Sequence, residues 1–257
     1  MTLTEAELER YSRQLVLPEW SGESQERLRQ SGAMVVGAGA LGSPASMYLA
    51  AAGIGWLGIV DSDAVELSNL HRQLLHFTPD VGVPKAENAA VKLRALNPEV
   101  QIDAYPARLD ASNAEAILAE VDVVLDCADS FETRYVVNDA CCALGVPLVE
   151  AAVLGLAGQV MTIAPGRSAC YRCAFAESPP AGSVPSCREA GVLGPVAGIA
   201  GSIQALEAIK LLTGVGSPLL DRILRIDAAT TEQTLIATER RDDCPACSQV
   251  PAAAQSS

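Results

Sequence analysis

The chain has 257 residues, which is enough for one large α/β domain. Its formal net charge of -13 excludes an extended nucleic-acid or anionic-membrane surface, because phosphate groups require a basic stripe that this sequence lacks. Hydrophobic residues make up 49% but aromatic residues only 4%, a balance typical of a sheet packed under helices by Ala, Val, Leu and Ile.

The first half of the chain alternates between two patterns. Apolar runs of strand length occur at residues 33–37, 56–61, 100–105, 121–129 and 146–153. Helical patterns lie between them, at residues 43–53, 85–97, 113–120 and 131–145. This order predicts a Rossmann-like, doubly wound, mainly parallel sheet that binds ligands at the carboxyl ends of its strands.

The rest of the chain differs in character. Residues 5–20 are expected to form a helix and turn outside the nucleotide fold, and residues 158–164 a further strand. Four prolines indicate a crossover loop at 176–195, followed by a helix at 200–212 and a hairpin at 222–238 that extends the sheet with antiparallel strands. We expect one domain over 1–250, with an N-terminal helical segment (1–30), a nucleotide-binding half (31–153), a second half (154–250) and a frayed tail (251–257).

Two features bear on the compartment. No basic segment followed by an apolar run opens the chain, so we expect a cytoplasmic protein without a secretory signal. Residues 33–60 carry no charge, but Pro44 and several glycines predict strand, turn, helix and strand rather than a membrane span. Disulfides are rare in a reducing compartment, so the spacing of the eight cysteines points to metal binding or catalysis.

A glycine motif follows the first predicted strand. Gly37, Gly39 and Gly42 have the spacing G-x-G-x-x-G, and Asp61 ends the second strand 19 positions later. Backbone N–H groups at such a turn bind phosphates, and a carboxylate at this distance binds ribose. The same pattern also fits a nicotinamide- or flavin-dependent oxidoreductase, or a turn that only packs a helix on a strand.

Polar groups suited to phosphate and metal follow the glycine motif. Ser68, Asn69 and Arg72 share one segment, and the arginine offers a planar fork for phosphate oxygens. Lys85 begins a helix, where the dipole disfavours a cation unless an anionic ligand is near. Asp129 ends the fourth strand, where a carboxylate can hold magnesium.

Several of these positions can also be explained without a ligand. Ser68 would also suit the N-cap of a surface helix, and Lys85 a solvated position. Asp63 is equally well explained as a solvated turn residue, and Asp126 as a turn or helix cap. We assign no role to His71.

Cysteine spacing gives a separate signal. Cys170 and Cys173 form one C-x-x-C pair and Cys244 and Cys247 another, with 70 residues between the pairs. Four thiolates suit a closed, tetrahedral, structural zinc site that would join distant segments. Two redox pairs, or buried thiols without a ligand, are the alternatives.

Several stretches in fixed order resemble the MoeB/ThiF family of ubiquitin-activating-enzyme-like adenylyltransferases. They are "RYSRQ" (10–14), "GAGALG" (37–42), "DSDAVELSNLHRQ" (61–73), "GVPKA" (82–86), "DCADSFETR" (126–134), "CYRC" (170–173), "SCREAGVLGP" (186–195) and "CPAC" (244–247). The resemblance covers nearly the whole chain. One departure is Ala40, where many members have glycine.

The resemblance implies ATP-dependent adenylation of the C-terminal glycine of a small ubiquitin-like sulfur-carrier protein that ends in Gly-Gly. It implies that Asp61 binds the ribose, that Asp129 holds magnesium, and that the second half of the chain binds carrier and zinc. It assigns the remaining nucleotide contacts to the glycine-loop residues Gly37, Gly39, Ala40 and Gly42 and to Ser68, Asn69, Arg72, Lys85 and Ser130.

Other implications concern partners. Arg13 resembles the arginine that reaches the partner's site in a homodimer, and Cys187 matches a cysteine that becomes linked to the carrier in the thiamin-type branch. The sequence does not distinguish a molybdopterin-type from a thiamin-type carrier. No sulfurtransferase-like segment follows Cys247, so we expect a separate sulfur donor. A non-catalytic, zinc-stabilised docking scaffold is a further alternative.

Overall fold

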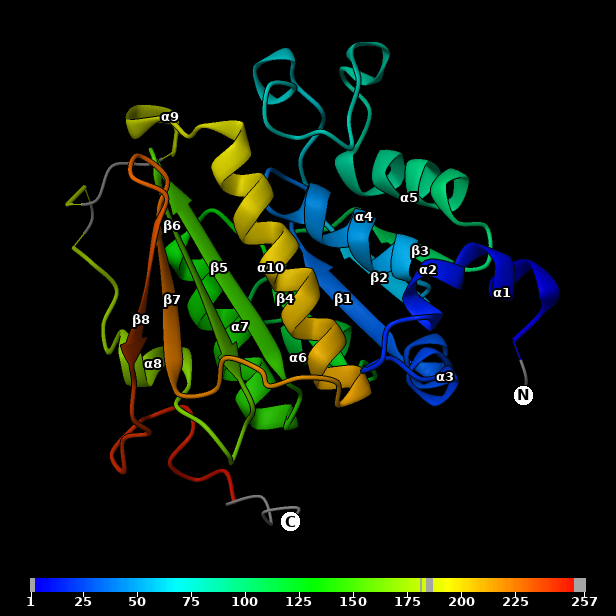
Figure 1. Cartoon of the computed structure of the whole chain (residues 1–257). Coiled ribbons are helices and arrows are strands. Elements are labelled where there is room, and N and C mark those ends of the chain that lie inside the picture. Colours follow the sequence, from blue (N-terminus) through cyan, green and yellow to red (C-terminus); the bar gives the residue numbers. More distant parts are fainter. Residues whose placement is uncertain (1–2, 181, 184–186, 252–257) are drawn as a thin grey trace.

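The architecture centres on one eight-stranded sheet with the strand order β3-β2-β1-β4-β5-β6-β7-β8 (Figure 1). The computed structural model describes residues 3–180, 182–183 and 187–251, without the side chains of residues 187 and 188. Neighbouring strands from β3 to β5 are parallel, and those from β5 to β8 are antiparallel. The predicted sheet, parallel first and antiparallel later, is confirmed. The strands are β1 (Gly32–Val36), β2 (Trp56–Val60), β3 (Gln101–Tyr105), β4 (Val123–Asp126), β5 (Leu148–Leu154), β6 (Ala157–Ile163), β7 (Arg222–Asp227) and β8 (Glu232–Ala237).

Helices cover both faces of the parallel half. Along β1, Ala33 and Val35 pack into one core layer, while Met34 and Val36 pack into the other, because successive side chains alternate across a strand. Helices α3, α4, α5 and α10 cover the first face, and α6, α7 and α8 the second. The helices are α1 (Glu5–Arg10), α2 (Ser12–Leu15), α3 (Gly22–Gln30), α4 (Gly42–Ala52), α5 (Lys85–Leu96), α6 (Ala114–Leu118), α7 (Phe131–Leu144), α8 (Tyr171–Ala174), α9 (Cys187–Ala190) and α10 (Gly194–Thr213), with short 3-10 turns at Leu67–Asn69 and Thr78–Asp80.

Several elements differ from the sequence prediction, among them the short helices α8 and α9, which were not predicted. Helix α3 lies within the N-terminal helical segment expected over residues 1–30, but its bounds were not predicted, because its stretch "GESQERLRQ" buries Leu28 as its one large apolar side chain. Helix α10 begins at Gly194 rather than at residue 200, since proline is tolerated in the first helical turn and Pro195 lies there. Strand β4 ends at Asp126 rather than at 129, so residues 127–130 leave the sheet at its ligand-binding edge.

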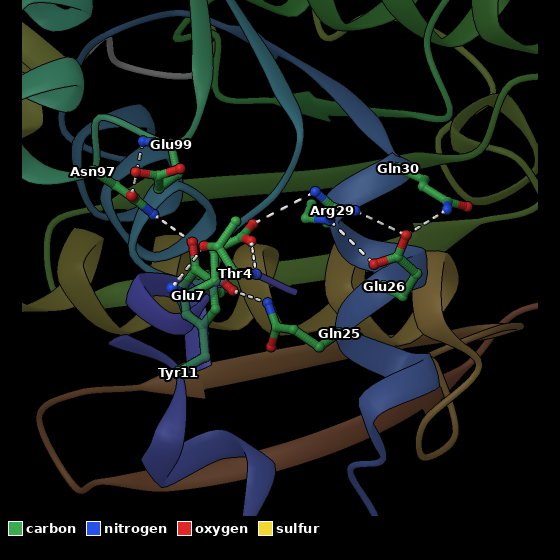
Figure 2. A network of polar contacts seen from close by, with 10 residues as sticks. Thr4, Glu7, Tyr11, Gln25, Glu26, Arg29, Gln30, Asn97 and Glu99 are labelled. Atoms are coloured by element: carbon green, nitrogen blue, oxygen red, sulfur yellow. Dashed lines mark hydrogen bonds and ion pairs between the residues drawn. The ribbon is translucent and has the colours of Figure 1, made fainter. Parts of the chain in front are cut away.

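The N-terminal helices dock onto the end of α4. The Tyr11 hydroxyl accepts a hydrogen bond from the Asn97 amide, 2.9 Å away (Figure 2). That amide also donates to the carbonyl of Ala50 in α4. The Gln25 amide donates to the carbonyl of Ala52 at 2.9 Å. The Tyr11 ring lies against Gly53, where an added Cβ would be 2.4 Å from the ring. This network fixes α2, which carries Arg13, against the end of α4.

Apolar length alone does not identify a membrane span here. Among the described residues, α10 is the one helix long and apolar enough to cross a membrane, and half of its apolar window is buried. Ala197, Ala200, Ala205 and Ala208 of this helix belong to the core cluster against the sheet. The uncharged stretch 33–60 forms β1, α4 and β2, as predicted.

Candidate active site

A cavity opens at the carboxyl ends of β1, β2 and β4. Seven of the predicted site residues line it: Gly37, Gly39, Ala40, Asp61, Arg72, Lys85 and Asp129. An adjoining cavity is lined by Ser68, Asn69 and Ser130, together with Arg72, Lys85 and Asp129 again. Residues from five separate stretches of the sequence therefore meet where a doubly wound sheet binds its ligand.

The glycine loop is shaped by close backbone contacts. Gly37 has a φ of +100°, and a Cβ there would lie 2.9 Å from the carbonyl oxygen of Cys127. Gly42 begins α4, and its Cβ would lie 1.8 Å from the carbonyl oxygen of Gly37. Gly42 is absent from the cavity lining, so it shapes the turn while Gly37, Gly39 and Ala40 form the cavity wall.

Asp61 ties the second strand to the glycine loop. Its Oδ2 accepts a hydrogen bond from the backbone N–H of Ala38 at 2.8 Å, and its Oδ1 accepts one from Asp63 at 2.8 Å. Burial raises the pKa of this carboxyl, while Lys85 and the two N–H donors lower it. Each oxygen keeps a further lone pair that can accept from a ligand hydroxyl.

Lys85 is held beneath the cavity by a neighbouring acid. Its ammonium lies 2.9 Å from Asp63, and 7% of the lysine side chain is exposed against 69% of the aspartate side chain. Asp63 is thus a partner of the lysine rather than a free turn residue. A buried cation whose counter-ion remains in solvent can bind an incoming phosphate at little desolvation cost.

The segment after β2 presents Arg72 to the cavity. Its guanidinium donates to the carbonyl of Ser68 at 2.8 Å and contacts His71 Nε2 at 2.9 Å. Asn69 is buried, and its side-chain oxygen accepts from the backbone N–H of Glu66. Ser68 lies inside the 3-10 turn whose N-cap is Glu66, so the N-cap alternative for this serine is wrong.

Asp129 lies exposed at the edge of both cavities, on the segment between β4 and α7. Among the described residues, its carboxylate has no hydrogen bond or ion pair, which leaves it free for a cation. Ser130 caps α7, since its hydroxyl accepts from the backbone N–H of Thr133 at 3.2 Å. Asp126 is fully buried and accepts from the N–H of Ala128, as its turn alternative predicts.

The four paired cysteines form one cluster. Their sulfur atoms all lie within 4.8 Å of one another, with 3.5 Å between Cys170 and Cys244 and 3.4 Å between Cys173 and Cys247. Tetrahedral zinc with Zn–S bonds of about 2.3 Å requires sulfur atoms about 3.8 Å apart. The donor set and its spacing therefore fit zinc, and none of the four cysteines lines either of the two cavities described above.

A third groove continues from the site along β5 and β6. It shares Asp129, Arg134 and Val153 with the first cavity. Beyond them it is lined by the aromatic rings of Tyr135, Tyr171 and Phe175, which contact each other at centroid distances of 5.2 and 4.9 Å. The groove thus runs from an aromatic wall to the charged cavity.

Two predicted residues lie apart from the cavities. Arg13 is exposed on α2 and lines neither of them. Cys187 begins α9, but its side chain lies outside the described part of the chain. The following residues Gly191 and Val192 line the second cavity, which brings the predicted crossover loop against the site.

The ThiF family model matches residues 11–246. The chain belongs to the ThiF family. It is 48% identical over 256 residues to the sulfur carrier protein adenylyltransferase of Thermus thermophilus, covering 98% of this chain and 94% of that protein. It is 46% identical to the SAMP-activating enzyme E1 of Haloferax volcanii, covering 97% and 92%. A crystal structure of E. coli MccB with ATP shares the fold, with a TM-score of 0.81, 24% identity, and coverage of 93% of this chain and 73% of that one.

Sequence reasoning about this ThiF-family chain missed two buried residues that shape the site. His76 Nδ1 lies 2.7 Å from the Asn88 amide nitrogen, a donor, so Nε2 carries the proton and donates to the carbonyl of Ala38 in the glycine loop. Burial lowers the pKa of His76, which keeps the ring neutral. Arg134 lies within the quoted "DCADSFETR" stretch, but no spacing rule marked it.

Proposed function

We propose that this chain uses ATP to adenylate the C-terminal glycine carboxylate of a small ubiquitin-like sulfur-carrier protein, with release of pyrophosphate. The observation that carries the proposal is the cavity in which Arg72, Lys85 and Asp129, a carboxylate with no partner among the described residues, meet the glycine loop. Two relatives that match nearly end to end are named for sulfur-carrier adenylation and for SAMP activation. Both names point to the same reaction class.

The cavity suits a reaction that needs alignment rather than proton transfer. The carrier's carboxylate is already a nucleophile at neutral pH, and it attacks the α-phosphate to give an acyl-adenylate and pyrophosphate. We assign Arg72 and Lys85 to the phosphates, where they neutralise charge that develops as the leaving group departs. Asp61 would accept from the ribose hydroxyls. The backbone of Gly37, Gly39 and Ala40, with Ser68, Asn69 and Ser130, would complete the nucleotide contacts.

Two metals fit residues of this chain. Asp129, an oxygen donor without a partner at the cavity edge, would hold magnesium, which neutralises phosphate charge when bound. Cys170, Cys173, Cys244 and Cys247 would hold zinc in a structural role, because four thiolates leave no open position for water.

A homodimer would explain why Arg13 has no hydrogen bond or ion pair with the residues that the structure describes. A second, apolar groove between α4 and α10 is lined by Tyr48, Leu74 and Ile199, which are 57%, 64% and 40% exposed. Arg72 lines this groove as well as the nucleotide cavity. A second copy bound on this face would therefore lie beside the site, where its Arg13 could reach the nucleotide.

We propose that the carrier tail lies in the aromatic groove and that sulfur comes from a separate donor protein in the cytoplasm. Among the described residues that line these cavities, Cys127 is the one cysteine. Burial raises the pKa of the Cys127 thiol well above its ordinary value, so it is a poor nucleophile for carrying sulfur. Either a molybdopterin-type or a thiamin-type carrier is compatible with this scheme.

Exchange of labelled pyrophosphate into ATP tests the proposal. We expect exchange with a carrier that ends in Gly-Gly and none with the same carrier lacking its last glycine. Asp129→Ala should abolish exchange without unfolding the protein, because an exposed side chain contributes little to packing. Binding of NAD(H) but not ATP would favour an oxidoreductase, and carrier binding without exchange would favour a docking scaffold.

A further inference from the structure

A buried charge cluster lies directly beneath the segment that carries Asp129. Asp126 at the end of β4, Arg134 in the first turn of α7 and Glu150 on β5 are 0%, 7% and 1% exposed. Arg134 forms an ion pair with Glu150, whose strand position is paired with that of Asp126 in the sheet. Burial raises the pKa of Asp126 to about 6 and that of Glu150 to about 7, although Arg134 lowers both.

The cluster forms hydrogen bonds with the peptide groups just before Asp129. The N–H of Ala128 donates to Asp126 Oδ1 at 2.9 Å, and the carbonyl of Ala128 accepts from Arg134 Nη2 at 2.9 Å. The carbonyl of Asp126 accepts from the Gln204 amide on α10 at 2.8 Å. The N–H and the carbonyl of Ala128 are therefore both held by charged side chains, which fixes the backbone directly before Asp129.

Stability alone is a poor explanation for this arrangement. Burying two carboxylates and one guanidinium costs several kcal/mol per ion, and apolar replacements are often neutral or stabilising. Asp126 Oδ2 has no hydrogen-bond partner among the described residues, so the cluster is not arranged for complete pairing. Its place at the site is distinctive, because Arg134 is the one cation in the described part of the chain that lines both the nucleotide cavity and the aromatic groove.

We propose that Arg134, held by Glu150, is a positioning residue that sets the Asp129 carboxylate between the bound nucleotide and the carrier tail. The inference rests on the proposed adenylation, since it gives Asp129 a metal and the groove a tail. Arg134 acts through the carbonyl of Ala128 rather than by touching the reacting atoms. A guanidinium suits this role because its planar fork bonds Glu150 and that carbonyl together.

Arg134→Lys is the informative variant. It keeps the positive charge, but one ammonium does not reproduce the forked geometry. We expect the Mn²⁺ dissociation constant, measured by electron paramagnetic resonance with a non-hydrolysable ATP analogue, to rise about 10- to 100-fold, as for other residues that orient a metal ligand. The kcat of pyrophosphate exchange should fall by a similar factor, with the KM for ATP changed about twofold at most.

Arg29→Lys is the matched control, because Arg29 also forms ion pairs with two carboxylates, those of Glu26 and Glu7 (Figure 2). These residues belong to the N-terminal network, which is distant from Arg134 in the sequence. The control variant should leave Mn²⁺ binding and kcat at wild-type values. Should Arg134→Lys not fold, Glu150→Gln serves instead, because its amide oxygen still accepts from Arg134 while the charge is lost. We expect a smaller change in the same direction.

Wild-type Mn²⁺ binding and kcat in a folded Arg134→Lys protein, or in Glu150→Gln where that variant replaces it, would overturn the inference. A drop in melting temperature without either change would show a purely structural role. Failure of the proposed function is distinguishable, because the wild-type chain would then exchange no pyrophosphate. The Mn²⁺ titration needs nucleotide and metal only, so it still tests the positioning.

Discussion

Replacing one thiolate of the proposed zinc site should destabilise the fold before it affects chemistry. Cys173→Ser removes a ligand from the cluster that joins α8 to the segment after β8, and 70 residues separate Cys173 from Cys244. If the metal is treated as a cross-link, closing a loop of this length is worth about 4 kcal/mol in chain entropy. For a protein of this size, each kcal/mol shifts the melting temperature by about 2–4 °C. We therefore expect a fall of about 8–16 °C.

The assay pairs calorimetry with elemental analysis. Wild-type protein should carry one zinc per chain, and a chelator should lower its melting temperature as the mutation does. Cys141→Ser is the control, because this buried thiol on α7 lies outside the cluster, so its zinc content should not change. The reasoning is refuted if Cys173→Ser melts like the wild type, or if it loses adenylation in the folded fraction without losing stability.

Four further outcomes are expected. Lys85→Met should lower exchange about 10²- to 10³-fold with little change in melting temperature, because its partner carboxylate is already in solvent; equal losses of both would contradict this. An equal mixture of the Arg13→Ala and Asp129→Ala proteins should recover about a quarter of wild-type activity if Arg13 acts on the partner's site in a symmetric dimer. The mixture should recover none if Arg13 acts within its own chain. Burial lowers the pKa of His76, so below about pH 6.5 the unfolded chain binds more protons than the folded chain. The free energy of unfolding should therefore fall as the pH drops through that value. His76→Gln should reduce this dependence on pH, measured by urea titrations. Cys187→Ala should keep pyrophosphate exchange but lose any disulfide-type carrier adduct on a non-reducing gel, whereas loss of exchange would place the thiol earlier in the reaction.

The positions of the strands along the chain were predictable because each apolar run of strand length indicates a buried strand. The glycines indicate a turn that only they can form. That the segment from Asp61 to Arg72 lies close to Lys85 and Asp129 was also predictable, because a doubly wound sheet brings together the residues that follow its strands. These signals are local in the sequence. Their positions in the structure follow from the topology.

The supporting residues could not be predicted in this way. His76 and Arg134 act through the carbonyls of Ala38 and Ala128, and a contact across 38 positions, or across a helix start, leaves no periodic trace. The bounds of helix α3, within the expected helical segment 1–30, were not predicted because the helix is mostly polar and has a single buried leucine. Tertiary contacts, rather than intrinsic preference, decide such elements.

The strand order has a consequence for the nascent chain. Strand β1 pairs with β2 on one edge and with β4 on the other, and β4 begins at Val123, 87 positions after β1 ends at Val36. At about 5–20 residues per second, roughly 4 to 17 seconds separate the synthesis of these two strands. During that interval the apolar run Ala33–Val36 has one unpaired edge, the kind of template to which another chain can add. Strand β1, an interior strand of the finished sheet, is thus an edge strand while the protein is being made, and that is when chaperones would matter most to it.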